Sequence, residues 1–466
     1  MTIDLLSSLK THILLICTPA TNNYQPTTKL EKNNKKIINA WCMYDWANSA
    51  YSLTITTAIL PGYFLWVTEN PSNGHLVDFL GFSVVNSALW SFALSFAFLL
   101  AAALSPFLTS IADYTGKKKM FMQIFCYMGA ASCSYLFFFT KDNVTLSVIA
   151  FILAGVGFSG SIVFYNSFLP EIATDDQMDK VSAKGFTFGY VGSVLLLIFN
   201  LAMILKPELF GINSERHGDL PARISFLSVG IWWFAFAQYS FYYLPSNVYK
   251  KEAKGNWLFN GFKELKKVFA ELKWQGLLKR FLLAFFFYNM GVQTVMYVAT
   301  IFGKKELHLE TAELIIVILI LQVIAILGAI VFAKVSARFG NIKALGICVV
   351  IWMGVCVGAY FVQTGNQFYG VAVVVGFVMG GVQSLSRSTY SKLIPKDTID
   401  HASYFSFYDV CDKVSVVLGT LMFGLVDQIT KDMRNSIIVL GILFVIGLIF
   451  LSGIPSKKSY DIKKEI

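Results

Sequence analysis

Ionisable side chains interrupt several long apolar stretches of this sequence. Asp45 lies in the first such stretch, and Asp409 and Lys413 lie in a stretch near the C-terminus, four residues apart with the acid first. A charge in apolar surroundings needs a partner or an aqueous cavity, because its removal from water is costly. These three residues are therefore candidates for binding a charged group, and Asp45 is also the candidate for carrying a proton.

Polar residues accompany the first of these charges at helical spacing. Asn48 and Ser49, Ser52 and Thr56 follow Asp45 by three and four, seven and eleven residues, which places them along one face of a helix. The pattern predicts a polar stripe that lines a cavity. The alternative is a stripe that joins two helices through hydrogen bonds.

Lys413 has more than one possible partner, and the sequence leaves the choice open. Asp409 on the same helix is one, and Asp45 across a cavity or the carboxylate of a bound molecule is another. Asp412 adjoins Lys413 and is compatible with contact to water. Arg387 lies eight residues before Pro395, so its position fits both ligand binding and an extension to the aqueous surface.

Neutral polar groups complete the predicted binding site, with structural hydrogen bonding as their alternative role. They occur on a stretch around residue 290 and on another around residue 383. The residues predicted to bind a ligand are Asp45, Asn48, Ser52, Tyr288, Asn289, Gln293, Gln383, Asp409 and Lys413.

The sequence predicts no metal site, cofactor or enzymatic activity. The seven cysteines include no CxxC pair, and the five histidines are scattered without ligand spacing. No GxxxxGK[ST] loop is present to bind ATP. Uphill movement of a solute by this chain would therefore have to use an ion gradient or the gradient of the solute.

The elements that position these residues are membrane-spanning helices. The chain has 466 residues, of which 56% are hydrophobic and only 14% charged, whereas soluble domains carry about 25% charged residues. This excludes a soluble enzyme, a secreted disulfide scaffold and a nucleic-acid-binding protein. The tracts near 20 residues, long enough for a bilayer, predict twelve spans: 38–67, 82–109, 119–140, 146–169, 184–205, 223–244, 280–302, 312–333, 344–362, 368–392, 403–426 and 435–453.

Positive charge is unevenly distributed between these spans. Lys and Arg concentrate in both tails and in alternate loops, above all in residues 245–280. The positive-inside rule then predicts that both termini are cytosolic, so the formal charge of +10 reports topology. The apolar stretch His12–Ala20 is too short to span a bilayer, and we expect no signal peptide.

These patterns divide the chain into five predicted parts. They are a cytosolic tail (1–36), a first six-helix half (37–244), a cytosolic linker (245–279), a second six-helix half (280–453) and a second cytosolic tail (454–466). The linker alternates apolar residues such as Phe262 and Val268 with lysines at helical spacing, which predicts a basic amphipathic helix at the cytosolic interface. We expect this helix to tether the two halves; binding a partner is the alternative.

The two halves resemble each other in sequence. Residues 155–170 and 380–395 align without gaps and are identical at five of sixteen positions, including Tyr165 with Tyr390. The loop 111–119 matches 335–343 at nearly the same displacement, through Gly116 with Gly340 and Lys119 with Lys343. Six helices duplicated in parallel predict an all-α membrane protein of twelve helices, with a 6+6 pseudo-two-fold arrangement of the major facilitator type.

Motifs in the sequence support that fold. The loop Thr109-x-x-x-Asp113-x-x-Gly116-Lys-Lys-Lys resembles the signature loop of the major facilitator superfamily, and its second copy keeps only Arg338 and Gly340. The first span reads YDWANSAY from Tyr44, which resembles the vacuolar amino-acid effluxer branch of that superfamily, related to autophagy in fungi and with bacterial relatives. The resemblance implies a gating loop made by Asp113, Gly116, Lys117, Lys118, Arg338 and Gly340.

Together these observations predict a secondary transporter. We expect a small polar organic solute, an amino acid or a similar zwitterion, to move by alternating access with possible proton coupling through Asp45. The alternatives are a peptide, cell-wall fragment or sugar on the same fold, and, from other classes, an integral-membrane transferase or a non-transporting receptor. We expect a monomer in a lipid bilayer, in the inner membrane of a bacterium or the vacuolar membrane of a eukaryote, without nucleic acid.

Overall fold

The computed structural model describes residues 31–70, 73–213, 218–246, 257–431 and 433–455. Most of the two predicted tails and residues 247–256 of the predicted linker therefore lie outside the described residues, as do His12, Cys17 and His217. Helices dominate the described chain, which also contains one short hairpin of two antiparallel strands, β1 (Leu76–Phe79) and β2 (Phe82–Val85).

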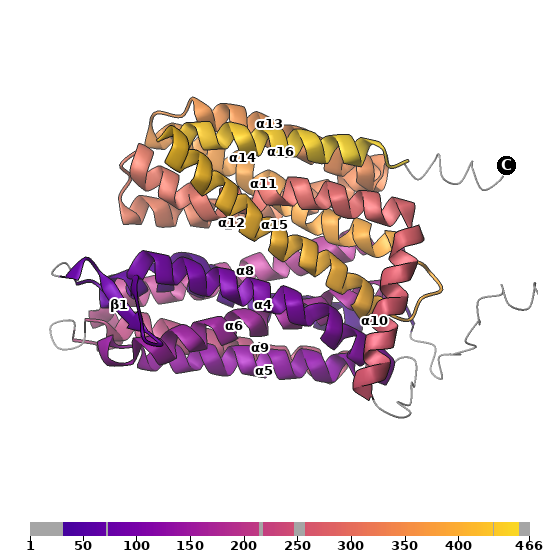
Figure 1. Cartoon of the computed structure of the whole chain (residues 1–466), viewed down its shortest axis with the longest axis horizontal. Coiled ribbons are helices and arrows are strands. Elements are labelled where there is room, and N and C mark those ends of the chain that lie inside the picture. Colours follow the sequence, from indigo (N-terminus) through magenta and orange to yellow (C-terminus); the bar gives the residue numbers. More distant parts are fainter. Residues whose placement is uncertain (1–30, 71–72, 214–217, 247–256, 432, 456–466) are drawn as a thin grey trace, which may run out of the picture.

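The helices form two bundles that follow each other in the chain (Figure 1). The first bundle contains α2 (Lys35–Ala50), a π-helical segment (Tyr51–Ala58), α3 (Leu60–Val67), α4 (Asn86–Thr115), α5 (Lys118–Tyr135), α6 (Val144–Ser167), α7 (Leu169–Ile172), α8 (Met178–Leu205) and α9 (Leu220–Tyr243). The second contains α11 (Gly276–Glu306), α12 (Thr311–Phe339), α13 (Asn341–Tyr360), α14 (Gly365–Leu393), α15 (His401–Thr430) and α16 (Met433–Ser452). Helix α10 (Trp257–Trp274) connects the bundles, and 3₁₀ turns occupy Leu136–Phe138, Lys141–Asn143 and Pro207–Phe210.

Each bundle has its own apolar core. Trp41 and Trp233 are fully buried in the first, and Trp352 and Phe444 are fully buried in the second. Many other large apolar side chains lie on the outer surfaces of the helices, where a soluble protein would carry charge. Burial of one helix face and exposure of the other to hydrocarbon follow from the sequence, whose spans are apolar on every side.

Helix packing repeats in the same order in the two bundles. Helix α2 contacts α9 as α11 contacts α16, α4 contacts α6 as α12 contacts α14, and α5 contacts α9 as α13 contacts α16. The aligned glycines Gly155 and Gly380 both approach an alanine of the neighbouring helix, Ala97 and Ala325, so closely that a Cβ atom would collide. The predicted parallel 6+6 fold is confirmed.

The number of spans is close to the predicted twelve. Among the described residues, ten helices are long and apolar enough to cross a bilayer, and the bent pair formed by Lys35–Ala58 and Leu60–Val67 adds an eleventh. Helix α15 is 30 residues long but contains Asp409, Asp412 and Lys413, and it is not among them. The prediction was wrong for residues 82–85, which form β2 because the tight turn at Leu80 and Gly81, both with positive φ, pairs them with β1.

The first span is bent where its backbone changes. Residues Tyr51–Ala58 wind as a π-helix, and α3 then departs by 43°. Pro61 lies at the start of α3 and removes a backbone donor there.

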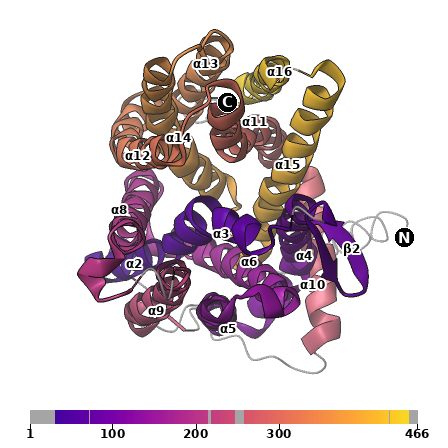
Figure 2. The same ribbon diagram turned by 90° about the vertical axis from the view of Figure 1, so that its left-hand side faces the viewer.

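The two ends of the molecule differ, and we call them the α10 end and the hairpin end. Helix α10 lies at one end beside α4 and α15, and the β1–β2 hairpin lies at the other (Figure 1). Viewed from the hairpin end, the first bundle lies on one side and the second bundle on the other (Figure 2). Direct contacts between the bundles run from α4 and α6 to α15, from α7 to α14, and from α8 to α12 and α14.

Candidate functional site

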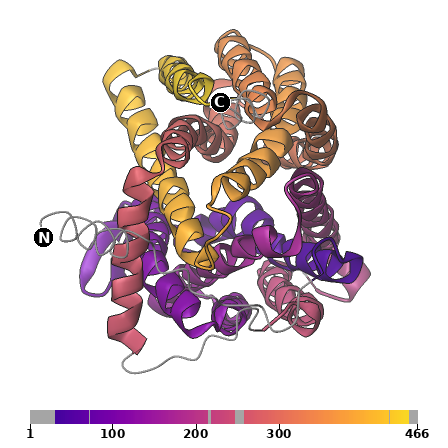
Figure 3. The ribbon, with the colours of Figure 1, turned by 90° about the vertical axis from the view of Figure 1, so that its right-hand side faces the viewer.

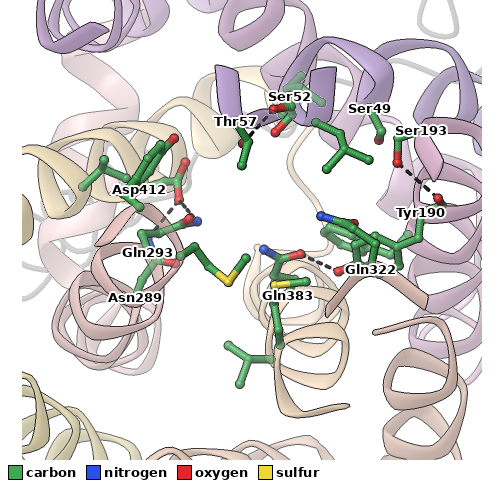
Figure 4. A pocket seen from close by; sticks show the side chains of 18 of the residues that line it. Ser49, Ser52, Thr57, Tyr190, Ser193, Asn289, Gln293, Gln322, Gln383 and Asp412 are labelled. Atoms are coloured by element: carbon green, nitrogen blue, oxygen red, sulfur yellow. Dashed lines mark hydrogen bonds between the residues drawn. The ribbon is translucent and has the colours of Figure 1, made fainter. Parts of the chain in front are cut away.

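A cavity of about 280 Å³ lies between the two bundles (Figure 4). Both bundles contribute side chains to it, from α2, the π-helical segment, α8, α11, α14 and α15 among others. Seven of the nine predicted binding residues line it: Asp45, Asn48, Ser52, Asn289, Gln293, Gln383 and Lys413.

The other two predicted binding residues lie outside the cavity lining. Tyr288 is fully buried, and its hydroxyl is 2.8 Å from Ser386 Oγ. It precedes Asn289 by one residue, about 100° around the helix, so it cannot share the face that Asn289 and Gln293 present. Asp409 is 4% exposed, and its Oδ1 lies 3.6 Å from Lys413 Nζ, so it contacts a lining residue without lining the cavity itself.

One side of the cavity is built around Arg387, which reaches from α14 into the first bundle. Its Nη1 is 3.2 Å from Asp45 Oδ2 on α2, to which the Tyr165 hydroxyl also donates at 2.6 Å. Its Nε and Nη2 donate to the hydroxyl and carbonyl oxygens of Ser182 on α8. Arg387 is 3% exposed, so it does not extend to the aqueous surface, and the pair it forms with Asp45 joins the two bundles.

Aromatic rings enclose the same guanidinium group. Its central carbon lies 4.1 Å from the ring centroid of Phe186 and 4.7 Å from that of Trp41. The YDWANSAY motif of the first span thus supplies the acid, while Trp41, just before it, supplies a ring. A cation–π contact is stronger where water is excluded, as it is around this buried guanidinium group.

The opposite side of the cavity is built around Asp412. Lys413 Nζ is 2.7 Å from Asp412 Oδ2 and 3.6 Å from Asp409 Oδ1. The side-chain amides of Asn289 and Gln293 donate to Asp412 Oδ1 at 2.9 and 3.4 Å; both amides and Asp412 are visible in Figure 4. The ion pairs of Lys413 are thus with carboxylates on its own helix, while Asp45 is paired with Arg387.

The polar stripe of the first span continues with an offset of one residue. Ser49, Ser52 and Thr57 line the cavity, whereas Thr56 does not and is 9% exposed. The prediction for Thr56 assumed α-helical spacing, but Ser52 and Thr57 lie in the π-helical segment, where the Thr57 hydroxyl donates to the Ser52 carbonyl. A π-turn places residue i+5, instead of i+4, above residue i.

Sequence reasoning missed several lining residues. Arg387 and Asp412 were noticed as charges but not assigned to the site, and the rule that charges within spans face a cavity was sufficient to include them. Gln322 is the single polar residue between Leu314 and Ala333 in the most apolar span, and the same rule was sufficient to include it. Tyr190 was not predicted, and its hydroxyl donates to Gln383 at 2.6 Å across the bundle interface.

The predicted gating loop lies at the α10 end, where it meets the start of α15. Asp113 accepts hydrogen bonds from the backbone N–H and the hydroxyl of Ser403, at 2.7 and 2.8 Å. Lys118 pairs with Glu171, whose Oε1 is also 3.0 Å from His401 Nδ1 in the second bundle. Gly116 adopts a φ of 69° and ends α4, a conformation that favours glycine.

The second copy of this loop makes its contacts through different residues. Lys117 of the first copy and Arg338 of the second are both exposed to solvent. Gly340, with a φ of 88°, separates α12 from α13. The neighbours Ser336 and Asn341 donate to Asp179 at 2.9 and 2.7 Å. Asp179, with Lys392 at 2.7 Å, was not predicted. The contacts of Asp113, Glu171 and Asp179 with the second bundle, together with the Asp45–Arg387 pair, close the α10 end.

A metal centre has no support in the described part of the chain. No group of three or more His, Cys, Asp or Glu side chains is positioned there to hold a metal ion. Of the cysteines that the structure describes, five are buried and Cys411 is partly buried, all as free thiols. The polar groups that line the cavity are linked by hydrogen bonds and ion pairs.

Comparison with known proteins places this site in context. Residues 33–463 match the family model described as vacuole effluxer Atg22 like. The chain is similar to the uncharacterised MFS-type transporter YxiO of Bacillus subtilis, with 33% identity over 92% of this chain and 96% of that one. It is also similar to autophagy-related protein 22 of Saccharomyces cerevisiae, with 25% identity over 80% and 78% of the two chains.

Solved structures share the fold at low identity. The major facilitator superfamily transporter FucP, from E. coli, matches with a TM-score of 0.67 and 13% identity over 91% of this chain and 98% of that one. The human organic anion transporter MFSD10 matches with a TM-score of 0.65 and 11% identity over 90% and 100%.

Proposed function

The chain belongs to the Atg22-like vacuole effluxer family of major facilitator transporters, and from this premise we propose that it carries an amino acid or a similar small zwitterion. The observation that carries the proposal is one cavity with an ion pair on each side, Asp45 with Arg387 and Asp412 with Lys413. A zwitterion offers one group to each kind of charge, and the neutral amides between them supply further hydrogen bonds.

The carboxylate of Asp412 is the proposed partner of the solute ammonium group. It is the more accessible acid of its cluster, with a side chain 20% exposed against 5% for Asp409. Lys413 is shared between these two carboxylates, so their side of the cavity has one more acid than base and favours a cation. The solute carboxylate then meets the Nζ of Lys413 or the polar groups that surround Arg387.

Alternating access requires the α10 end to open, and the Asp45–Arg387 pair is the proposed control point. A proton on Asp45 would remove the charge that holds Arg387 across the bundle interface. This is how we propose that Asp45 couples proton movement to transport. The conformation described here, closed at the α10 end, would be the one that loads from the hairpin end.

We further propose that the α10 end faces the cytosol, as the distribution of Lys and Arg predicts. The protein would then reside as a monomer in the inner membrane of a bacterium, or in the vacuolar membrane of a eukaryote. Both placements leave the hairpin end on the side away from the cytosol.

Uptake into proteoliposomes tests the function directly. Vesicles that contain the purified protein would be offered a pool of radiolabelled amino acids, with and without an imposed pH gradient, and empty vesicles as the control. We expect accumulation of a subset of amino acids that unlabelled solute inhibits. Uptake of short peptides or sugars but of no amino acid would assign the same fold to a different solute.

A further inference from the structure

Helix α10 lies at the rim of the closed end of the molecule. It runs crosswise to the long helices of both bundles in Figure 1, and the view onto that end in Figure 3 places it along one edge. In a protein whose long helices cross a bilayer, a helix at this position lies at the level of the lipid headgroups.

The inner face of α10 is fixed to both bundles. Val268 is fully buried, and Leu272 is 9% exposed. Asn260 donates to the Tyr114 hydroxyl of the first bundle at 2.9 Å, and the Tyr404 hydroxyl of the second bundle donates to Glu271 at 3.0 Å. The helix therefore has a defined orientation, and its other face is turned away from the protein.

That outer face is rich in exposed aromatic side chains. Phe259, Phe262 and Phe269 are 61%, 57% and 62% exposed, and Trp274 is 85% exposed. Phe269 lies at the edge of this group, with its ring centroid 6.1 Å from that of Phe407 on α15. A single exposed aromatic residue is ordinary, but four on one 18-residue helix form an apolar patch that needs an occupant. Trp and Phe are residues that favour the boundary between headgroups and acyl chains.

Positive charges border this patch. Lys263, Lys266 and Lys273 are exposed, and the Lys263 ammonium lies 4.8 Å from the ring centroid of Phe259. The acids of α10 have partners within the protein, because Glu264 pairs with Lys267 and Glu271 accepts from the Tyr404 hydroxyl of the second bundle. Aromatic rings with flanking ammonium groups complement a surface that is apolar below and anionic above.

We propose that the outer face of α10 is a docking surface for anionic membrane lipids. The aromatic rings enter the boundary of the acyl chains, and the ammonium groups of Lys263, Lys266 and Lys273 bind the headgroup phosphates. A lipid held there acts on an element that contacts both bundles at the end that must open. The proposal does not depend on which solute the cavity binds.

A fluorescent probe on this face tests the proposal. Ala270 is exposed and lies among these side chains, so the full-length Ala270→Cys variant would carry an environment-sensitive dye in nanodiscs. We expect its emission to shift to shorter wavelength as phosphatidylglycerol replaces phosphatidylcholine, with quenching by spin-labelled lipid. Each lysine near an anionic surface contributes roughly fivefold to binding. Lys263→Gln, Lys266→Gln and Lys273→Gln together should raise the half-maximal phosphatidylglycerol fraction severalfold.

A second triple variant controls for net charge. Lys141, Lys206 and Lys304 are exposed near the hairpin end, and their replacement by Gln should leave the titration unchanged. Equal effects of the two triple variants, or an emission that ignores phosphatidylglycerol, would overturn the proposal. A dye that spin-labelled lipid never quenches would also overturn it, because the face would then meet water or another protein.

Discussion

Nη1 of Arg387 on α14 lies 3.2 Å from Oδ2 of Asp45 on α2, and this ion pair joins the two bundles at one side of the cavity. Both residues are buried, at 3% and 5% exposure, so water can replace a lost partner of either charge only to a small extent. Removal of one charge leaves the other desolvated, and such a change costs about 3–5 kcal/mol. The pair is therefore the point at which transport and stability are most directly linked.

A double-mutant cycle measures this link. We expect Asp45→Asn and Arg387→Gln each to lower the melting temperature and to abolish proton-dependent uptake, with the double variant less destabilised than the sum. Tyr165→Phe is the matched control, because it removes a hydrogen bond to Asp45 and leaves both charges. Additive stability losses would contradict the pairing.

Asp45 and Lys413 should behave independently in stability. They line the same cavity, but the partners of Lys413 are Asp409 and Asp412. The stability losses of Asp45→Asn and Lys413→Gln should therefore add in the double variant within about 0.5 kcal/mol. A coupling energy well above this value would mean that the two charges meet directly, as one alternative from the sequence suggested.

Gly185 on α8 offers a way to disturb the ion pair without removing a charge. A Cβ atom there would lie 2.7 Å from Asp45 Oδ2 and 2.9 Å from Arg387 Nη2, closer than atoms normally pack. We expect Gly185→Ala to destabilise the protein by about 1–3 kcal/mol, as overpacking does, and to weaken the pH dependence of uptake. Gly354→Ala is the control, since no neighbouring atom lies within 4 Å of the position that its added methyl group would take; a similar loss there would contradict the explanation.

The attachment of α10 should resist changes in pH near neutrality. Partial burial opposes the charge on Lys267, but the carboxylates of Asp400 and Glu264 outweigh it and raise the pKa of Lys267 above its usual range. Because the pKa of Lys267 is higher in the folded state, its ion pairs with Asp400 and Glu264 are complete below the unfolded pKa of about 10.4. They are lost only as pH rises through the folded pKa of Lys267.

A spin label on the Ala270→Cys variant in detergent measures how firmly these ion pairs of Lys267 hold α10, because a loosened helix makes the label more mobile. We expect constant mobility between about pH 6 and pH 9, where lysine remains charged. Lys267→Gln should raise the mobility at every pH, whereas Lys266→Gln, the exposed neighbour, should not. An increase in mobility within that range would show that other groups hold the helix.

Topology is testable with single cysteines at the two ends. The described cysteines are buried or partly buried, so labelling of the natural thiols should be low. Glu208→Cys, at an exposed site near the hairpin end, should react with an impermeant reagent applied to intact cells, and Arg338→Cys, exposed at the α10 end, should not. The reverse pattern would invert the orientation.

The sequence was sufficient for the fold because its two strongest signals are physical requirements of the bilayer. Length of apolar tracts and the repeat around Gly155 and Gly380 act over long segments, so small boundary errors do not alter them. Seven of nine predicted binding residues line the cavity for the same reason, since a polar group in a span must avoid lipid.

Which charged residues pair with each other could be learned only from the three-dimensional structure. Arg387, Asp45, Asp412 and Lys413 offer several combinations at compatible spacing, and the choice depends on how α14 approaches α2 across the bundle interface. Asp179 and His401 are similar cases, because they lie in or beside loops where one sequence carries no distance information. Tertiary contacts between the bundles decide these partners.

The π-helical segment Tyr51–Ala58 changes what one transmembrane span can offer. It acts as a phase shift of one residue, so Asp45 before the segment and Thr57 near its end face the same space although they are out of step on an α-helical wheel. If the same residues wound as a regular α-helix, everything after the segment would rotate by about 100° and Thr57 would turn away from the cavity. The winding of this span is thus as constrained as residue identity.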